Sequence, residues 1–195
     1  MRIFVVSDIW GATEPFKKLC QDIGDNVISI DPYDGVNLSF SDEQQAYQHF
    51  IKNVGLEQYT QLVFHQVSQH KQSAGILIGF SIGASAIWNI SSMLSEYQIM
   101  KAYCFYGGQI RHKTDMLPSI EIELIAPQSE AHFDQNEMLN AIQKIKKVNI
   151  QRTPYYHGFM NSLSRNFDKQ GYEKYLDLLV RLSHYKMKIA AYFLW

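Results

Sequence analysis

The chain has 195 residues, of which 46% are hydrophobic and 19% are charged. This is the balance of a soluble globular protein, and the length fits a single domain over residues 1–195. A formal net charge of −1, an isoelectric point near 6.6 and the absence of a long basic run argue against nucleic acid or an anionic membrane as a partner.

Two features of the sequence predict a cytoplasmic protein. Only four apolar residues separate Arg2 from Ser7, too few for a signal-peptide core, and no apolar run approaches membrane-spanning length. The two cysteines, Cys20 and Cys104, have neither a metal-binding nor a redox spacing. We therefore expect both to be buried free thiols in a reducing compartment.

The first half of the chain alternates between strand and helix patterns. Ile3 to Val6 is an apolar, β-branched run typical of a central strand. Thr13 is a candidate N-cap for a helix with Pro15 in its first turn, and a strand over 26–30 follows. Ser41 and Gln44 have the spacing of a capping box. Further helical patterns then cover 41–51 and 56–69.

The second half continues the alternation. Strands are predicted at 75–80, 102–106, 120–126 and 148–152, and helices at 84–94, 134–145 and 169–192. Strands separated by helices pair in parallel. The sequence therefore predicts an α/β fold: a three-layer sandwich with a mostly parallel, doubly wound sheet of about six strands.

The strand at 75–80 leads into the pattern G-x-S-x-G, formed by Gly79-Phe80-Ser81-Ile82-Gly83. In α/β hydrolases this pattern makes the nucleophile elbow, a sharp turn between a strand and a helix that exposes a serine hydroxyl. The pattern alone arises by chance in roughly one sequence of this composition in twenty. Its position between a buried strand and a helix favours Ser81 as a nucleophile over a simple helix N-cap.

A serine nucleophile needs a histidine base and a carboxylate that orients it, in the chain order Ser, acid, His. His157 follows the last predicted strand and is the best placed histidine for this role. The loop after the strand at 120–126 contains two candidate acids, Glu130 and Asp134, and either fits the required order. Asp134 is also a candidate N-cap for the helix that follows.

The chain resembles the dienelactone hydrolase family of α/β hydrolases over nearly its whole length. Each of the following segments is given with its family counterpart: Asp8-Ile9-Trp10-Gly11 (E-I-F-G), Asp31-Pro32-Tyr33 (D-L-Y), Gly79-Phe80-Ser81-Ile82-Gly83 (G-Y-C-L-G), Tyr106-Gly107-Gly108 (Y-Y-G) and His157-Gly158-Phe159 (H-G-F).

The resemblance implies an activity and a set of catalytic residues. Ser81 would cleave a small carboxylic ester or thioester through an acyl-serine intermediate, with His157 as the base and no cofactor. The resemblance also ranks Glu130 above Asp134 as the acid, and it assigns the oxyanion hole to the backbone amides of Ile9 and Ile82. It also implies a sheet without the strand pair that precedes the oxyanion strand in that family.

The chain departs from the family pattern in ways that bear on the substrate. Ser81 stands where that family commonly has cysteine, and Asp34 or Gly35 and Asn161 stand at the places of its two substrate-binding arginines. Dienelactone is therefore not the expected substrate. The lack of these arginines also leaves an alternative function open, namely the binding of a ligand or partner by a catalytically silent α/β-hydrolase-like protein.

Three further residues and one segment were considered from the sequence. Asp8 can either polarise the site or hold its loop. His112 and His132 lack a metal-ligand spacing, so no metal site is predicted. The apolar C-terminal segment 189–195 is expected to dock on the body of the protein or on a second subunit, which makes a homodimer possible.

Overall fold

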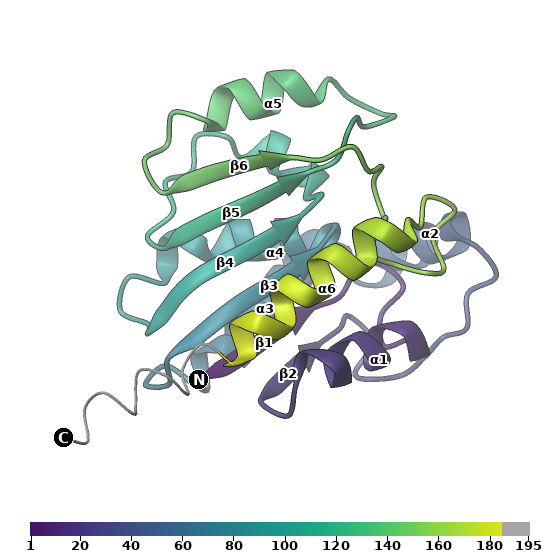
Figure 1. Ribbon diagram of the computed structural model, residues 1–195, viewed down its shortest axis with the longest axis horizontal. Helices are drawn as coiled ribbons and strands as arrows, with labels where there is room; N and C mark the ends of the chain where they lie inside the picture. The colour runs from purple at the N-terminus through teal and green to yellow at the C-terminus, as the bar shows by residue number, and fades with distance from the viewer. Residues whose placement is uncertain (185–195) are drawn as a thin grey trace.

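The computed structural model describes residues 1–184. A single sheet of six strands runs through it in the order β2-β1-β3-β4-β5-β6, and all five strand pairings are parallel (Figure 1). The strands are β1 Arg2–Val6, β2 Val27–Ile30, β3 Gly75–Phe80, β4 Ile99–Phe105, β5 Glu121–Ala126 and β6 Val148–Arg152. The predicted fold class and the number of strands are confirmed, and the sheet fits an α/β-hydrolase fold without its first strand pair.

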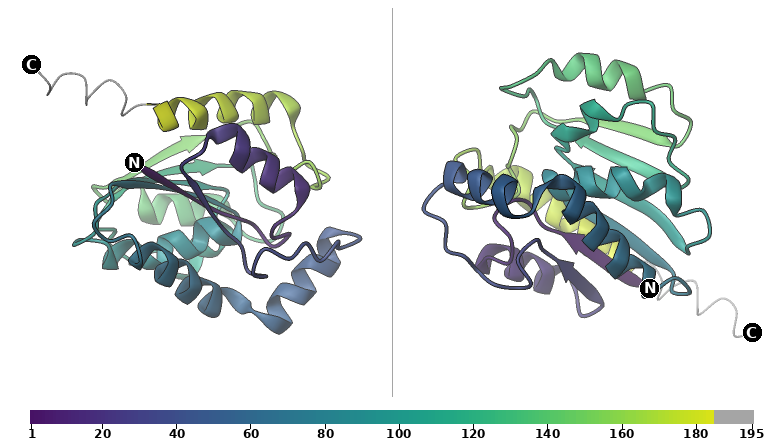
Figure 2. Two further views of the ribbon diagram at one scale, coloured as in Figure 1. Left: turned by 90° about the horizontal axis from the view of Figure 1, so that it is seen from below. Right: turned by 180° about the vertical axis from the view of Figure 1, so that it is seen from behind.

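Helices cover both faces of the sheet, as Figure 2 shows from two directions. On one face lie α1 Glu14–Ile23 and α6 Lys169–His184, which pack against each other. The other face is covered by α2 Glu43–Asn53, α3 Gly55–Ser68, α4 Ile82–Ile90 and α5 Gln135–Ile142. Two short 3₁₀ turns, η1 Ser91–Met93 and η2 Gly108–His112, flank β4.

The sheet separates two hydrophobic clusters because successive side chains of a strand point to opposite faces. In β1, Ile3 and Val5 join the cluster beneath α1 and α6, whereas Phe4 and Val6 join the cluster beneath α2 to α5. All six residues of β3 are buried, as a central strand of a parallel sheet requires.

The strand order places a switch point between β1 and β3. From β1 the chain moves to β2 on one side, and it then returns to β3 on the other. In open α/β sheets such a reversal leaves a crevice at the carboxyl ends of the strands, where ligands bind. The loop after β1 and the turn after β3 meet at this crevice, so the residues that follow Val6 and Phe80 are the first to consider as a site.

Several local predictions can be compared with the structure. Thr13 caps α1 as predicted, but the cap of α2 is Asp42 rather than Ser41, because the Asp42 carboxylate accepts the backbone N–H of Gln45 at 2.8 Å. Cys20 and Cys104 are free and buried, as predicted. The part of the predicted last helix beyond His184, and the segment 189–195, lie outside the described residues.

The helices of residues 1–184 are all too short or too polar to cross a membrane.

A buried tyrosine ties the ends of β1 and β2 to α3. The Tyr59 hydroxyl, in a fully buried side chain, lies 3.1 Å from the carbonyl oxygens of both Ser7 and Ile30. Burial raises the pKa of Tyr59 well above its usual value, so the hydroxyl keeps its proton and acts as a donor to these carbonyls. A side chain of α3 therefore holds the start of the loop after β1.

We predict that Tyr59→Phe lowers the free energy of unfolding by about 1 to 2 kcal/mol, because the Ser7 carbonyl loses its donor and the Ile30 carbonyl keeps only the backbone N–H of Ser7. Urea denaturation measures this change. Tyr47→Phe is a matched control, since Tyr47 is half exposed on α2. Equal stability of the two variants would contradict a structural role for the Tyr59 hydroxyl.

Candidate active site

Ser81 lies in a strained turn between β3 and α4. Its φ of 53° and ψ of −111° place a non-glycine residue at positive φ. The two flanking glycines are required by close packing. A Cβ at Gly79 would lie 2.7 Å from the backbone nitrogen of Ala84, and one at Gly83 would lie 2.4 Å from the carbonyl oxygen of Ser7. The chain therefore passes from β3 to α4 through a sharp turn, and the strain at Ser81, its non-glycine residue at positive φ, presents that side chain above the sheet.

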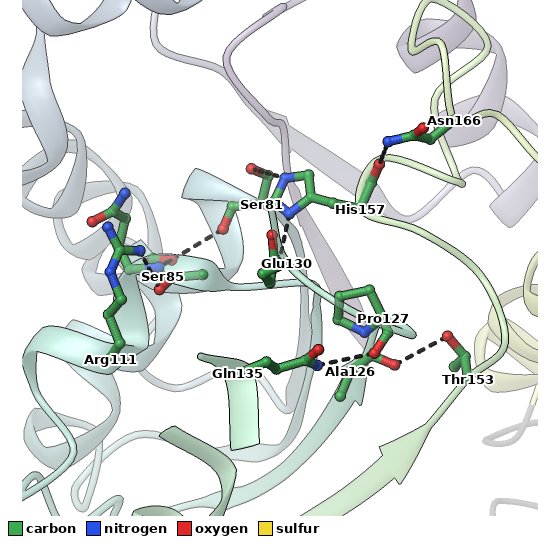
Figure 3. A network of polar contacts seen from close by, with 12 residues as sticks. Ser81, Ser85, Arg111, Ala126, Pro127, Glu130, Gln135, Thr153, His157 and Asn166 are labelled. Atoms are coloured by element: carbon green, nitrogen blue, oxygen red, sulfur yellow. Dashed lines mark hydrogen bonds and ion pairs between the residues drawn. The ribbon is translucent and has the colours of Figure 1, made fainter. Parts of the chain in front are cut away.

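The Ser81 side chain faces His157 rather than the end of its own helix. Its hydroxyl oxygen lies 2.9 Å from His157 Nε2 (Figure 3). Although Ser81 occupies the N-cap position of α4, its side chain makes no capping hydrogen bond. The Ser85 hydroxyl donates to the Ser81 carbonyl at 3.1 Å and accepts the backbone N–H of Gln109 at 3.3 Å, so it joins the first turn of α4 to η2. The simple capping role considered for Ser81 is therefore absent from this structure.

Glu130 lies on the other side of the imidazole. Its carboxylate oxygen is 2.8 Å from His157 Nδ1, and its side chain is only 9% exposed. An ionised carboxylate only accepts hydrogen bonds, so the proton belongs on Nδ1 and Nε2 is free to accept the Ser81 hydroxyl proton. The three side chains thus form one continuous chain of hydrogen bonds.

Asp134 lies apart from this chain. Its carboxylate accepts the backbone N–H of Asn136 at 2.8 Å and caps α5. The structure therefore brings Glu130, and not Asp134, to His157.

Hydrogen bonds fix the two loops that carry Glu130 and His157. The backbone N–H of Gln128 donates to the carbonyl of Tyr155 and joins the loops directly. Gln135 donates to the Pro127 carbonyl at 2.9 Å, and Asn166 donates to the His157 carbonyl at 2.9 Å (Figure 3). Loops positioned on a rigid sheet in this way hold catalytic groups at defined distances.

Two backbone amides next to the site are free to bind an anion. Ile82 is the first residue of α4, so its N–H has no partner within the helix. Within residues 1–184, the N–H groups of Ile9 and Ile82 both lack an acceptor. The loop that carries Ile9 is anchored by Tyr33, whose hydroxyl donates to the Ile9 carbonyl at 2.7 Å. The N-terminus of α4 also favours negative charge through the helix dipole.

Asp8 holds the loop after β1. One carboxylate oxygen accepts the backbone N–H of Trp10 at 2.9 Å, and the other accepts the side-chain amide of Asn161 at 2.7 Å. Burial raises the pKa of Asp8, although both of these hydrogen bonds act to lower it.

An open cleft of about 310 Å³ lies beside the loop after β1. Its apolar walls include Trp10, Phe40 and Leu163, and its polar walls include Asn37 and Ser39. Among residues 1–184, neither arginine nor lysine lines it, and Glu14 is the charged residue of its lining. The cleft is suited to an uncharged, partly apolar group.

In the described part of the chain, no group of three or more His, Cys, Asp or Glu side chains is arranged to hold a metal ion.

Some residues that shape the site carried no sequence signal. Gln135 and Asn166 donate to carbonyls of irregular segments, and neither periodicity nor a motif marks them. Tyr33 lies in a segment that resembles the family's D-L-Y, but that resemblance does not reveal its hydrogen bond to the Ile9 carbonyl. This contact depends on which loop lies beside the end of β2.

The sequence was compared with known protein families and curated proteins. No family model matches the sequence. An uncharacterized protein of Bacillus subtilis, YczH, is 25% identical over 143 residues, which cover 72% of this chain and 69% of that protein.

Solved structures with a similar fold are hydrolases by name. A dienelactone hydrolase-like promiscuous phosphotriesterase from metagenomic libraries covers 93% of this chain and 84% of its own at a TM-score of 0.62 and 12% identity. Est1E from Butyrivibrio proteoclasticus, bound to ferulic acid, has a TM-score of 0.63 at 8% identity and covers 96% and 90%. Mouse α/β hydrolase domain-containing protein 10 has a TM-score of 0.61 at 10% identity and covers 92% and 88%. The chain has the α/β-hydrolase fold.

We predict that Gly83→Ala destabilises the protein by about 2 to 3 kcal/mol, because the added methyl meets the backbone of β1, which cannot yield. Gly108→Ala is the control, since its methyl would meet only the Phe133 ring, at 3.3 Å. Urea denaturation compares the two. A Gly83→Ala variant as stable as Gly108→Ala would show that α4 does not depend on this close approach.

Proposed function

We propose that the protein is a serine hydrolase that cleaves small carboxylic esters or thioesters through an acyl-serine intermediate. The observation that carries the proposal is the chain of hydrogen bonds from Glu130 through His157 to Ser81, at 2.8 and 2.9 Å. The arrangement has the nucleophile, base and orienting acid that acyl transfer needs, in the order found in α/β hydrolases.

In the acylation step the Ser81 oxygen attacks the carbonyl carbon of the substrate while His157 Nε2 accepts the hydroxyl proton. Glu130 stabilises the imidazolium that forms. The backbone amides of Ile9 and Ile82 donate to the oxyanion, an effect worth roughly 3 to 4 kcal/mol for a donor in a comparable site. The imidazolium then protonates the leaving alcohol or thiol, and the acyl group remains on Ser81.

In the deacylation step water takes the place of the alcohol. His157 Nε2 accepts a proton from the water, whose oxygen attacks the acyl-serine carbonyl, and the same amides stabilise the second oxyanion. Collapse of this intermediate returns the proton to Ser81 and releases the carboxylic acid. All of these steps use groups of this chain.

The cleft supports an uncharged substrate. Trp10 lines the cleft and is the neighbour of Ile9 in the chain, so the cleft adjoins the loop of the proposed oxyanion hole, and we assign it to a group of the substrate away from the reacting carbonyl. The cleft lacks the cations that would bind a substrate carboxylate, and its apolar walls favour a short aliphatic or aromatic group.

A fluorophosphonate probe is expected to label the wild-type protein at Ser81, and the wild type is expected to hydrolyse p-nitrophenyl esters of short acids. Ser81→Ala should lose the labelling, and Ser81→Ala and His157→Ala should each lose on the order of 10⁴-fold or more in kcat/KM. Mass spectrometry and initial rates measure these changes. Circular dichroism verifies that the variants are folded.

Labelling that persists in Ser81→Ala would contradict the proposal. A folded wild type that neither reacts with the probe nor hydrolyses any ester in a panel of varied chain length and charge would favour the silent ligand-binding function instead.

The identity of the acid gives a separate prediction. Glu130→Gln keeps the shape of the side chain but removes its charge, so kcat should fall on the order of 10³-fold or more. Asp134→Asn should stay within about threefold of wild type, because asparagine also caps helices well. Ester hydrolysis rates compare the two variants, and a larger loss in Asp134→Asn would reverse the assignment.

A further inference from the structure

Asp8 and Asn161 join two loops that are far apart in sequence. The Asn161 side-chain amide donates to one oxygen of the Asp8 carboxylate at 2.7 Å, across 153 positions of the chain. The other Asp8 oxygen accepts the backbone N–H of Trp10, and the other end of the Asn161 side chain accepts the backbone N–H of Leu163 at 2.9 Å. Each side chain therefore fixes its own loop and also the neighbouring loop.

The two loops carry the groups that must act together in the proposed reaction. Asp8 immediately precedes Ile9, whose amide is a proposed oxyanion donor. Asn161 follows His157 by four residues, and its backbone N–H also donates to the Gly158 carbonyl at 2.9 Å. The Asp8–Asn161 hydrogen bond is thus a direct side-chain link between the oxyanion loop and the loop of the base.

The surroundings of this link are mostly apolar. Asp8 and Asn161 are both partly buried, and they line a small, partly open hollow of about 20 Å³ whose other walls are mainly apolar side chains. A donor or acceptor that loses its partner here is costly, because few polar side chains lie near enough to replace that partner. The titratable groups that act on the Asp8 carboxylate are His157, Glu43 and three tyrosines, Tyr33, Tyr59 and Tyr106.

We propose that Asp8 and Asn161 are positioning residues, which set the distance between the Ile9 amide and the His157 imidazole through their mutual hydrogen bond. The inference rests on the proposed hydrolase function. In this role the activity depends on the hydrogen-bond geometry of the pair and not on which of the two residues carries the negative charge. If Asp8 instead acted on the reaction through its charge, the activity would be lost whenever the charge left position 8.

An exchange of the two side chains separates these roles. In the double variant Asp8→Asn/Asn161→Asp, the amide at position 8 accepts from Trp10 and donates across to position 161, and the carboxylate there accepts from Leu163. Every hydrogen bond is retained, while the charge moves to the other loop. In Asp8→Asn alone, the amide NH₂ groups of positions 8 and 161 face each other, so neither finds an acceptor. In Asn161→Asp alone, two carboxylates face each other and neither finds a donor.

The test measures kcat and KM for a short-chain p-nitrophenyl ester in all four proteins. Each single variant should lose about 10- to 100-fold in kcat with KM changed less than about threefold, since small misplacements of catalytic groups cost up to about 100-fold. The exchange variant should return to within about fivefold of wild type. An exchange variant as slow as Asp8→Asn, or single variants with unchanged kcat, would overturn the proposal.

A matched control and a second readout complete the design. The exposed neighbours Asp25 and Asn26 allow the same exchange, Asp25→Asn/Asn26→Asp, just before the amino end of β2 and so at the opposite end of the strands from the site, where no change is expected. Hydrogen exchange of the Trp10 amide should accelerate in the single variants and recover in the exchange variant. If the wild type hydrolyses no ester, the proposed function fails, and this exchange rate still decides whether the link holds the loop.

Discussion

The placement of Ser81, the proposed nucleophile, depends on how closely α4 approaches β1. Gly83 brings the first turn of α4 against the carbonyls of Val6 and Ser7, where even a methyl group would overlap. The free amide of Ile82, one residue earlier, is thereby fixed beside the loop that carries Ile9. Backbone sterics, more than side-chain packing, thus set the relative position of the two proposed oxyanion donors.

Polar side chains fix the loops that the sheet does not hold by itself. The loops after β1, β5 and β6 are irregular, and hydrophobic contacts alone would leave their carbonyls unsatisfied and their paths undefined. Tyr33, Gln135 and Asn166 each donate to a carbonyl in one of these loops. A sheet with a buried, mostly apolar centre therefore acts as the support, and a few hydrogen bonds orient the proposed reactive groups.

The fold was predictable from the sequence because each strand and helix has a distinct hydrophobic period, and Ser81 was marked by a motif with a steric cause. The choice between Glu130 and Asp134 was different. Both follow β5 in one loop, and only the resemblance to a family ranked them before the structure brought Glu130 to His157. The cap of α2 was misplaced by one residue, since Ser41 and Asp42 are both good caps. The partner of Asn161 could not be predicted, because no local pattern reports a contact across the sheet.

The two thiols have a consequence for how the protein responds to oxidants. Cys20 is buried in α1 and Cys104 in β4, and burial raises the pKa of each to about 12. Peroxide and disulfides react with the thiolate, which at neutral pH is then only about one part in 10⁵ of either side chain. Ser81 stands where the family that the chain resembles commonly has a reactive cysteine, and neither Cys20 nor Cys104 belongs to the hydrogen-bonded set of Ser81, His157 and Glu130. The proposed chemistry therefore does not depend on the redox state of a thiol.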